Sequence, residues 1–130
     1  MIRLVVGLGN PGTEYQRTRH NLAWMVLDKL SFVQKLQWSE KFKGLYTTHA
    51  VNANKIFFLK PQTFMNLSGE SLVPCAQFFK IPFDEILVLH DEVDLPFGQI
   101  MFKTGGGLAG HNGLKSIAEQ LGSQEFHRLR

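Results

Sequence analysis

The chain has 130 residues, of which 44% are hydrophobic and 19% are charged. This composition is typical of a globular protein and excludes a disordered chain, and the length predicts one domain over residues 1–130. The sequence holds neither an apolar run of membrane-spanning length nor a signal-peptide pattern, so neither class is expected.

The net charge and the number of cysteines bear on which partner and which cellular compartment are expected. The formal net charge of +3 is compatible with a polyanionic partner without establishing one, because many basic proteins bind no nucleic acid. The only cysteine, Cys75, excludes an intrachain disulfide and favours a reducing cytoplasm. Its apolar neighbours Val73 and Pro74 indicate a packed residue rather than a nucleophile.

The first half of the chain predicts a helix between strands. Residues 2–6 form a β-branched apolar run typical of a buried strand. Apolar residues at helical spacing follow Asn21, which is a suitable helix cap. Two strand-like runs at 45–51 and 56–59 flank a polar tripeptide at 52–54, and together they predict a β-hairpin.

The second half continues this alternation. A helix is predicted within 63–79, where Pro74 should kink it or delay its start. Residues 85–89 and 99–103 have the composition of strands, and a further helix follows a glycine-rich loop. The pattern predicts an α/β sandwich with a mixed sheet. Because residues 126–130 resemble the start of another strand, we expect a truncated chain or an incomplete gene product.

The most informative segment is the glycine-rich loop at 105–110 and the helix start after it. Glycines let a ligand approach the backbone closely, and the free N–H groups of a helix start favour an anion. Lys103 and Lys115 bracket the segment with positive charge. It slightly favours an anion or ligand site over the alternative, a flexible loop before a helix. The helix itself is predicted by the spacing of Leu114, Ile117, Ala118 and Leu121.

A second glycine motif, at residues 7–12, matches the dinucleotide pattern GxGxxG after a strand. A dinucleotide fingerprint should open a helix directly and be followed by a strand ending in an acidic residue. Residues 13–19 have no apolar helical stripe, and the next strand does not follow at the required spacing. We therefore reject NAD or FAD binding; a GK[ST] phosphate loop is also absent.

His20 ends the polar loop that follows the first strand, where a lone histidine is usually only solvated. If strands 2–6 and 86–89 are parallel neighbours, the loops after them bring Asn10, His20 and Asp91 together. A carboxylate on one imidazole nitrogen fixes the tautomer and raises the basicity of the other. This makes His20 a candidate general base and Asp91 its orienting group.

Other chemistries have weaker support. The cluster His90, Asp91, Glu92 and Asp94 suggests a metal, but its spacing matches no strong ligand motif, and His90 is more simply packed under the sheet. Ser68 lacks the GxSxG context of a nucleophile and is interpreted as a helix-start residue. A histidine with carboxylate support and no Ser or Cys partner indicates an activated water.

Three asparagines, Asn10, Asn66 and Asn112, lie beside the expected site loops. Their amides can both donate and accept, which favours recognition of an amide or carbonyl group. The alternative is the usual role of asparagine as a turn or cap residue. Phe64 and Met65 are either core residues or an apolar platform for a nucleobase.

Taken in order, these segments resemble the bacterial peptidyl-tRNA hydrolase family. The matching stretches span essentially the whole chain and comprise residues 7–12, Tyr15, 18–21, 60–69, 90–98, 103–116 and 126–130. Each motif alone is weak, but the ordered set is highly specific. The resemblance implies a monomeric three-layer α/β/α sandwich with a mixed, twisted sheet. It implies hydrolysis of the ester between a peptide and the 3′ ribose of tRNA, with no metal or organic cofactor.

The resemblance also implies roles for individual residues. His20 is expected to deprotonate water, Asp91 to stabilise the proton-accepting state of His20, and Asn10 to discriminate N-blocked from free aminoacyl-tRNA. Lys103 and Arg130 are expected to clamp the 5′ phosphate of tRNA. The remaining residues are expected to contact the substrate or line its pocket: Tyr15, Phe64, Met65, Asn66, His111 and Asn112.

Three departures from the family pattern matter. The family usually has glycine at the position of Ala23 and an uninterrupted helix where Pro74 stands, and its members run well past Arg130. The absent part normally helps to grip tRNA, so the alternative is an inactive or tRNA-binding-only remnant. A nucleotide-binding flavodoxin-like module would explain the glycines but not His20, Asp91 and the asparagines together.

Overall fold

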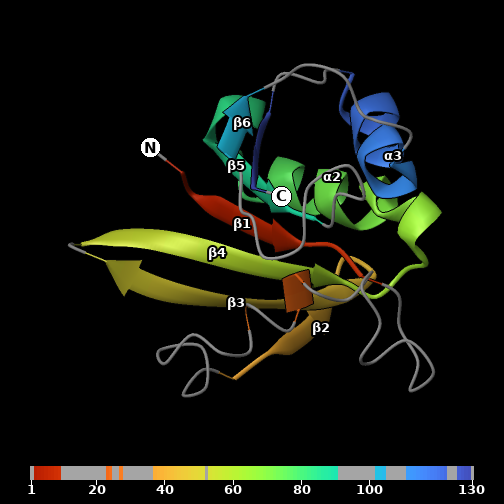
Figure 1. The fold of residues 1–130 in the computed structure, drawn as a ribbon. Coiled ribbons are helices and arrows are strands. Elements are labelled where there is room, and N and C mark those ends of the chain that lie inside the picture. The colour runs from red at the N-terminus through yellow and green to blue at the C-terminus, as the bar shows by residue number, and fades with distance from the viewer. Residues whose placement is uncertain are drawn as a thin grey trace.

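The computed structural model describes residues 2–9, 23–24, 27, 37–51, 53–90, 102–104, 111–122 and 126–129. These residues form one sheet with the strand order β2-β3-β4-β1-β5-β7-β6, against which helices pack (Figure 1). The strands are β1 (Leu4–Gly7), β2 (Ser39–Lys41), β3 (Gly44–Val51), β4 (Asn54–Pro61), β5 (Ile86–Leu89), β6 (Phe102–Thr104) and β7 (His127–Leu129).

The centre of the sheet is parallel. β1 lies between β4 and β5 and pairs in parallel with both, and β5 pairs in parallel with β7. The pairs β2–β3, β3–β4 and β6–β7 are antiparallel, so the prediction of a mixed sheet is confirmed. Gly7 pairs with Leu89, and the strands predicted over 2–6 and 86–89 are therefore parallel neighbours that end at the same edge.

Two hairpins lie on one side of this parallel centre. The predicted β3–β4 hairpin is confirmed: Val51 pairs with Asn54, and Ala53 in the turn has a φ of 69°. β2 was not predicted; it joins β3 through Phe42 and Lys43, whose φ values are 58° and 51°. Two positive φ values in a two-residue turn match the right-handed twist of the strands that it connects.

On the other side, the short strands agree with the sequence to within a few residues. The strand predicted over 85–89 is β5, with Glu85 in the preceding 3-10 helix η5 (Phe83–Glu85). Of the strand predicted over 99–103, residues 102–103 lie in β6, whereas residues 99–101 are outside the described residues. The terminal run at 126–130 contributes β7, which lies between β5 and β6 rather than at an edge.

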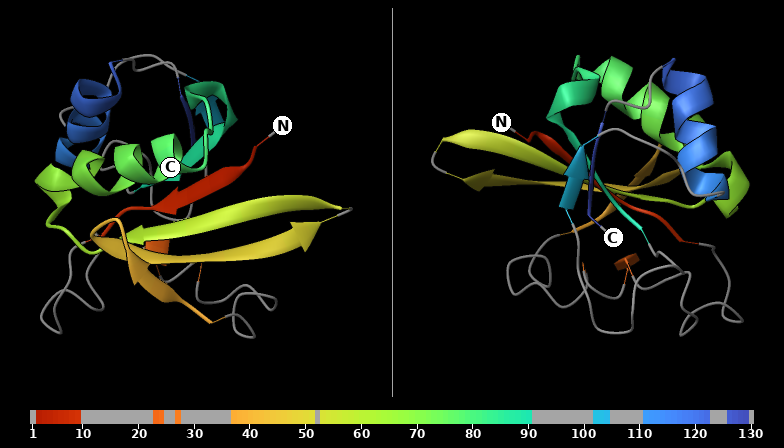
Figure 2. Two further views of the ribbon diagram at one scale, coloured as in Figure 1. Left: turned by 180° about the vertical axis from the view of Figure 1, so that it is seen from behind. Right: turned by 45° about the horizontal axis from the view of Figure 1, so that its top comes forward.

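One face of the sheet is covered by α2 (Gly69–Phe78) and α3 (Asn112–Leu121), which lie on the same side in both views of Figure 2. Successive side chains of a strand point to opposite faces. The cluster on this face therefore takes alternate residues of β1, β4 and β5 and joins them to the apolar sides of the two helices. Its strand members are Leu4, Val6, Phe57, Leu59, Ile86 and Val88, and its helix members include Leu72, Cys75, Leu114 and Ile117.

The opposite face carries a second buried cluster. Residues 23–24 and 27 are helical, as predicted, and the rest of the helix predicted after Asn21 lies outside the described residues. Ala23 and Leu27 pack with Phe58 and Leu89 of the sheet. Helical residues thus cover both faces, which confirms the three-layer α/β/α architecture. Ala23 is buried and fits its helix.

The helix predicted within 63–79 is divided. A 3-10 turn, η4 (Met65–Leu67), precedes α2, and α2 then runs without interruption through Pro74. Of the two effects predicted for Pro74, the delayed start is wrong, because the helix begins five residues before it, and the kink stays a prediction. Its ring is exposed, whereas Val73 and Cys75 on either side are buried in the core, and their packing holds the helix in place. None of the described helices is long and apolar enough to cross a membrane.

Candidate active site

The parallel strands bring several predicted site segments to one edge of the sheet. Beyond the last pair of the β1–β5 ladder, the backbone N–H of Leu8 donates to the carbonyl of Leu89 at 3.0 Å. The N–H of His90 donates to the carbonyl of Leu129 at 3.1 Å, which joins β7 to the same edge. The residues directly before Asn10 and Asp91 thus follow neighbouring strands. Four predicted residues, Asn10, Tyr15, His20 and Asp91, themselves lie outside the described residues.

The η4 turn and the start of α3 meet at this edge. Gly113 is buried, and a Cβ added to it would lie 2.7 Å from Met65 Sδ and 2.9 Å from Leu8 Cδ1. A side chain at this position would require the ends of the Met65 and Leu8 side chains to shift, so α3 approaches the end of β1 and η4 closely here. The structure therefore brings together Met65, from one predicted substrate segment, and the helix start that carries Asn112.

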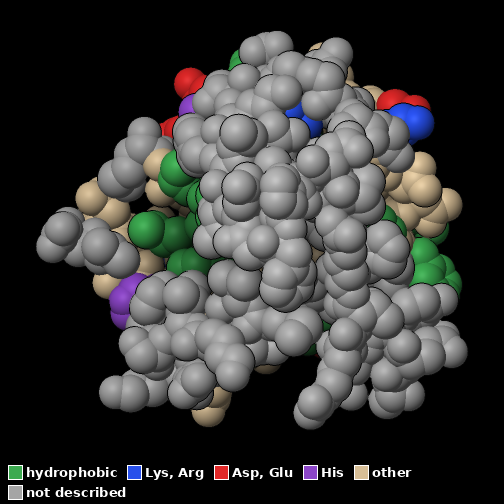
Figure 3. Space-filling model, viewed as in Figure 1, with side chains coloured by type: hydrophobic (Ala, Val, Ile, Leu, Met, Phe, Trp, Pro, Cys, Tyr) green, Lys and Arg blue, Asp and Glu red, His purple; other side chains and the backbone are tan. Residues whose placement is uncertain are grey.

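Around Met65 the side chains differ in exposure. Phe64 is 56% exposed, which removes the interpretation of Phe64 as a core residue and leaves the apolar platform. Met65 is half-buried and packs against the core. Asn66 and Asn112 are both exposed, one on η4 and one at the first position of α3. Hydrophobic side chains reach the surface on the right of Figure 3, the side on which η4 lies in Figure 1.

His111 caps α3 with its side chain. Its Nδ1 accepts hydrogen bonds from the backbone N–H groups of Gly113 at 3.1 Å and Leu114 at 3.3 Å. A helix start leaves such N–H groups without intrahelical acceptors, so the ring replaces a serine or asparagine cap. Because a backbone N–H only donates, Nδ1 carries no proton, and the proton of the neutral ring is on Nε2. His111 therefore stabilises the start of α3, and its neutral ring is held in the tautomer with the proton on Nε2.

His90 lies under this cap. It is 5% exposed, and its ring contacts that of His111 edge to face at a centroid separation of 5.0 Å. The simpler interpretation of His90, a residue packed at the end of its strand, is thus confirmed. Among the residues that the structure describes, no group of three His, Cys, Asp or Glu side chains is arranged to hold a metal ion. Asp91, Glu92 and Asp94 are outside those residues.

Two residues that were considered as nucleophiles have structural roles. Ser68 precedes α2, as predicted, and its hydroxyl donates to the carbonyl of Met65 at 2.7 Å. Cys75 is fully buried in the core, and burial raises the pKa of its thiol to about 12. A neutral buried thiol is a poor nucleophile.

The predicted phosphate-binding residues are only partly described. Lys103 is the middle residue of β6, where its Cα pairs with that of Arg128, but its side chain is outside the described part, as is Arg130. The sequence did not predict a role for Arg128 or for Ser116. Arg128 is 1% exposed inside the sheet, and Ser116 of α3 accepts a buried hydrogen bond from the start of α2. No local sequence pattern predicts the burial of Arg128 or the hydrogen bond of Ser116, because the first depends on strand pairing and the second on helix packing.

Comparison with known proteins identifies the family. The sequence model of the family described as peptidyl-tRNA hydrolase matches residues 4–130. The chain belongs to the peptidyl-tRNA hydrolase family. It is 48% identical over 130 residues to the peptidyl-tRNA hydrolase of Geotalea daltonii, and the aligned region covers 99% of this chain and 68% of that protein. It is 50% identical over 131 residues to that of Neisseria meningitidis serogroup C, again covering 99% of this chain and 68% of the relative.

The fold agrees with the same family. The crystal structure of peptidyl-tRNA hydrolase from Acinetobacter baumannii matches with a TM-score of 0.92 at 41% sequence identity. The match covers 99% of this chain and 66% of that one. The chain thus spans about two thirds of the length of its peptidyl-tRNA hydrolase relatives, and it contains every segment on which the family resemblance was based.

Proposed function

We propose that the chain hydrolyses the ester bond between the peptide and the tRNA of peptidyl-tRNA, releasing free tRNA for reuse in translation. The observation that carries this proposal is the family match over residues 4–130, which includes all the motif-bearing segments. The convergence of Met65, His111 and the α3 start at the carboxyl edge of the sheet supports it independently, because ligands of open α/β sheets bind at that edge.

The proposed reaction uses a water molecule activated by His20. His20 takes a proton from water, and Asp91 holds the imidazole in the tautomer that accepts it. The hydroxyl oxygen then bonds to the ester carbonyl carbon and the bond from that carbon to the ribose 3′ oxygen breaks. The 3′ oxygen takes up the proton held by His20, which leaves the free 3′ hydroxyl of the tRNA and the carboxyl group of the peptide. The hydrogen bond between Leu8 and Leu89 supports this pairing, since the segments that contain His20 and Asp91 follow these two strand ends.

Charge that develops on the carbonyl oxygen needs a hydrogen-bond donor nearby. A side-chain amide or a backbone N–H is suited to this oxyanion. Asn66 and Asn112 are candidates, because both are exposed on segments that meet at Gly113 and Met65. Phe64, Met65 and Tyr15 would provide apolar contact to the substrate. His111 would stabilise the start of α3 by capping it.

The site is proposed to recognise the first amide of the peptide, with Asn10 as a discriminating residue. A free aminoacyl-tRNA has a charged α-amine and no acyl carbonyl at that position. Polar groups arranged for an amide would then be left without partners, which disfavours that substrate. Side chains of the peptide need not be recognised.

The nucleic-acid part of the substrate is proposed to bind through positive charge. Lys103 and Arg130 would clamp the 5′ phosphate of the tRNA, and the 3′ acceptor end would enter at the α3 start. Phosphate contacts of this kind are electrostatic and weaken with added salt. The protein is proposed to act as a monomer in the cytoplasm, which agrees with its single, buried cysteine.

The test is cleavage of N-acetyl-aminoacyl-tRNA beside the same aminoacyl-tRNA with a free amine. We expect the 130-residue chain to cleave the first and to leave the second largely intact. Equal cleavage of both would contradict recognition of the amide. A folded chain that binds tRNA but cleaves neither substrate would favour the alternative, a protein that only binds tRNA.

A further inference from the structure

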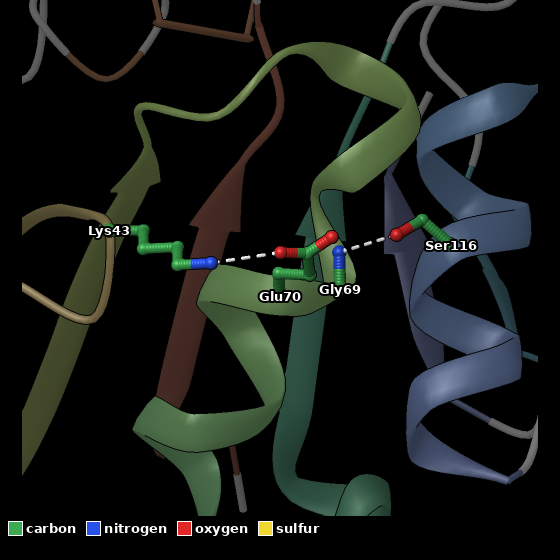
Figure 4. Close-up of polar contacts among 4 residues, drawn as sticks. All are labelled: Lys43, Gly69, Glu70 and Ser116. Atoms are coloured by element: carbon green, nitrogen blue, oxygen red, sulfur yellow. Dashed lines mark hydrogen bonds and ion pairs between the residues drawn. The ribbon is translucent and has the colours of Figure 1, made fainter.

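The start of α2 is capped by a side chain from α3. The backbone N–H of Gly69, the first residue of α2, donates to Ser116 Oγ at 2.8 Å across 47 residues of sequence (Figure 4). The first N–H groups of a helix have no acceptor within the helix. Ser68, in the capping position, makes no side-chain cap; its hydroxyl donates to the carbonyl of Met65. The cap of α2 therefore comes from the other helix.

The contact is close and dry. Ser116 is 7% exposed and Gly69 is buried. A Cβ on Gly69 would overlap the backbone carbonyl of Ser116 and would lie 2.8 Å from Gln120 Cγ. The two helices thus approach each other closely at their backbones. A buried N–H that loses its acceptor bears the full cost of its desolvation.

This hydrogen bond connects the two segments that carry candidate substrate contacts. η4, with Met65 and Asn66, ends two residues before Gly69. α3 begins at Asn112, about one turn before Ser116. The same neighbourhood includes the Lys43–Glu70 ion pair at 2.9 Å, which holds the β2–β3 turn to the first turn of α2 (Figure 4).

We propose that Ser116 is a positioning residue for the hydrolysis. By capping α2 from α3, it sets the place of η4 relative to the start of α3, and so the position of the apolar substrate contacts Phe64 and Met65 against that helix start. Ser116 is buried and acts through Gly69 rather than on the substrate. The inference rests on the proposed function, because it assigns the effect of this hydrogen bond to substrate binding.

Ser71 offers a matched control. It is a serine of α2, two residues after Gly69, and it is fully buried. Its Oγ has no hydrogen-bond partner within the described part of the chain. Ser71→Ala therefore removes a buried hydroxyl from the same helix without breaking the contact between the helices.

The experiment measures kcat and KM for N-acetyl-aminoacyl-tRNA with the full chain, Ser116→Ala and Ser71→Ala, at a temperature where all three are folded. We expect Ser116→Ala to raise KM about 3- to 10-fold, the effect of one buried hydrogen bond, with kcat within about twofold. Ser71→Ala should leave both constants within about twofold. A purely structural role would lower the active fraction, and thus kcat, without moving KM. An unchanged KM in folded Ser116→Ala overturns the proposal.

Hydrogen exchange of the Gly69 amide gives a second readout that does not need turnover. The amide should be protected in the parent chain and in Ser71→Ala, and should exchange faster in Ser116→Ala.

If Ser116→Ala does not fold, Ser116→Cys keeps a weaker acceptor and should raise KM about two- to threefold. A parental KM in that variant overturns the proposal. Lack of turnover by the folded parent overturns the proposed function and the positioning role together, whereas an unchanged KM in an active background overturns only the latter.

Discussion

At the scale of single residues, backbone donors decide the chemical state of His111. Two N–H groups point at Nδ1, so the neutral ring carries its proton on Nε2. The ring cannot take a proton on Nδ1 without losing both hydrogen bonds. The ring of His111 therefore serves as the cap of α3.

Replacing His111 tests the cap. We expect His111→Ala to lower the free energy of unfolding by about 1 kcal/mol, the usual effect of losing an N-cap, and His111→Asn to restore most of it. Urea unfolding of the three proteins measures this difference. Equal stability of the Ala and Asn variants would mean that the ring stabilises the protein by packing against His90 rather than by capping α3.

Cys75 makes a pH-dependent contribution to stability. Burial raises the pKa of its thiol from 9.0 to about 12. Below pH 9 the thiol is neutral in the folded and the unfolded chain. Between pH 9 and 12 the unfolded chain releases this proton while the folded chain keeps it, so the contribution of Cys75 falls as pH rises. A change to alanine also leaves a cavity, which lowers stability by a similar amount at every pH.

The expected outcome is a stability difference that depends on pH. Unfolding of the parent chain and Cys75→Ala by urea at pH 8, 9.5 and 10.5 should give a parent advantage that narrows as pH rises. A constant advantage across this range would show that the Cys75 thiol ionises with similar ease in both states.

At the scale of elements, α2 shows where packing overrides local preference. Proline inside a helix removes one backbone hydrogen bond, here the one to the carbonyl of Glu70, and its ring crowds the preceding turn. The helix persists because residues on both sides of Pro74 are buried in the core. The sequence correctly placed a helix in this region, but composition alone does not show that packing outweighs the proline.

Pro74→Ala should therefore stabilise the protein. The ring is exposed, so little packing is lost, and one helix hydrogen bond is regained. Proline also restricts the unfolded chain, which offsets part of the gain, and a net increase of about 1–2 kcal/mol in unfolding free energy is expected. Thermal or urea unfolding measures it. A loss of stability would mean that the core requires a bend that Pro74 imposes.

The elements that the sequence predicted correctly are those with a strong local pattern. The apolar runs at 2–6 and 86–89 gave buried parallel strands, and the spacing from Leu114 to Leu121 gave α3. β2 was missed because its three residues are polar and exposed, and it is defined only by pairing with β3. The Gly69–Ser116 hydrogen bond was missed for the same reason, since it joins residues that are distant in sequence.

At the scale of the whole molecule, the sheet gathers its candidate substrate segments at one edge. β1 and β5 end there, and η4 and the start of α3 pack beside them. The sequence predicted that the segments after β1 and β5 would lie together if these strands were parallel neighbours. The register of the two strands confirms that they are. Distances among Asn10, His20 and Asp91 depend on loop conformation, which residue types alone do not specify.

The net positive charge belongs to this scale too. We expect Lys103→Glu to weaken tRNA binding and to reduce the slope of log affinity against log salt by about 1, as for a phosphate contact. Lys55→Glu is the control, because it makes the same charge change at an exposed position of the β3–β4 hairpin. Lys55 lies near the amino end of β4, whereas the candidate site lies at the carboxyl edge of the parallel strands. Binding titrations at several salt concentrations measure both slopes. Equal effects of the two changes would show that Lys103 contributes only to overall charge.

Ester hydrolysis by this chain is proposed to depend most directly on His20, the candidate general base. The decisive measurement is cleavage of N-acetyl-aminoacyl-tRNA by the 130-residue chain and by His20→Ala, with tRNA affinity determined for both. We predict turnover by the parent chain and a loss of at least about 100-fold in the variant, with affinity little changed, as expected for removal of a general base. Near-parental turnover by His20→Ala would contradict the account.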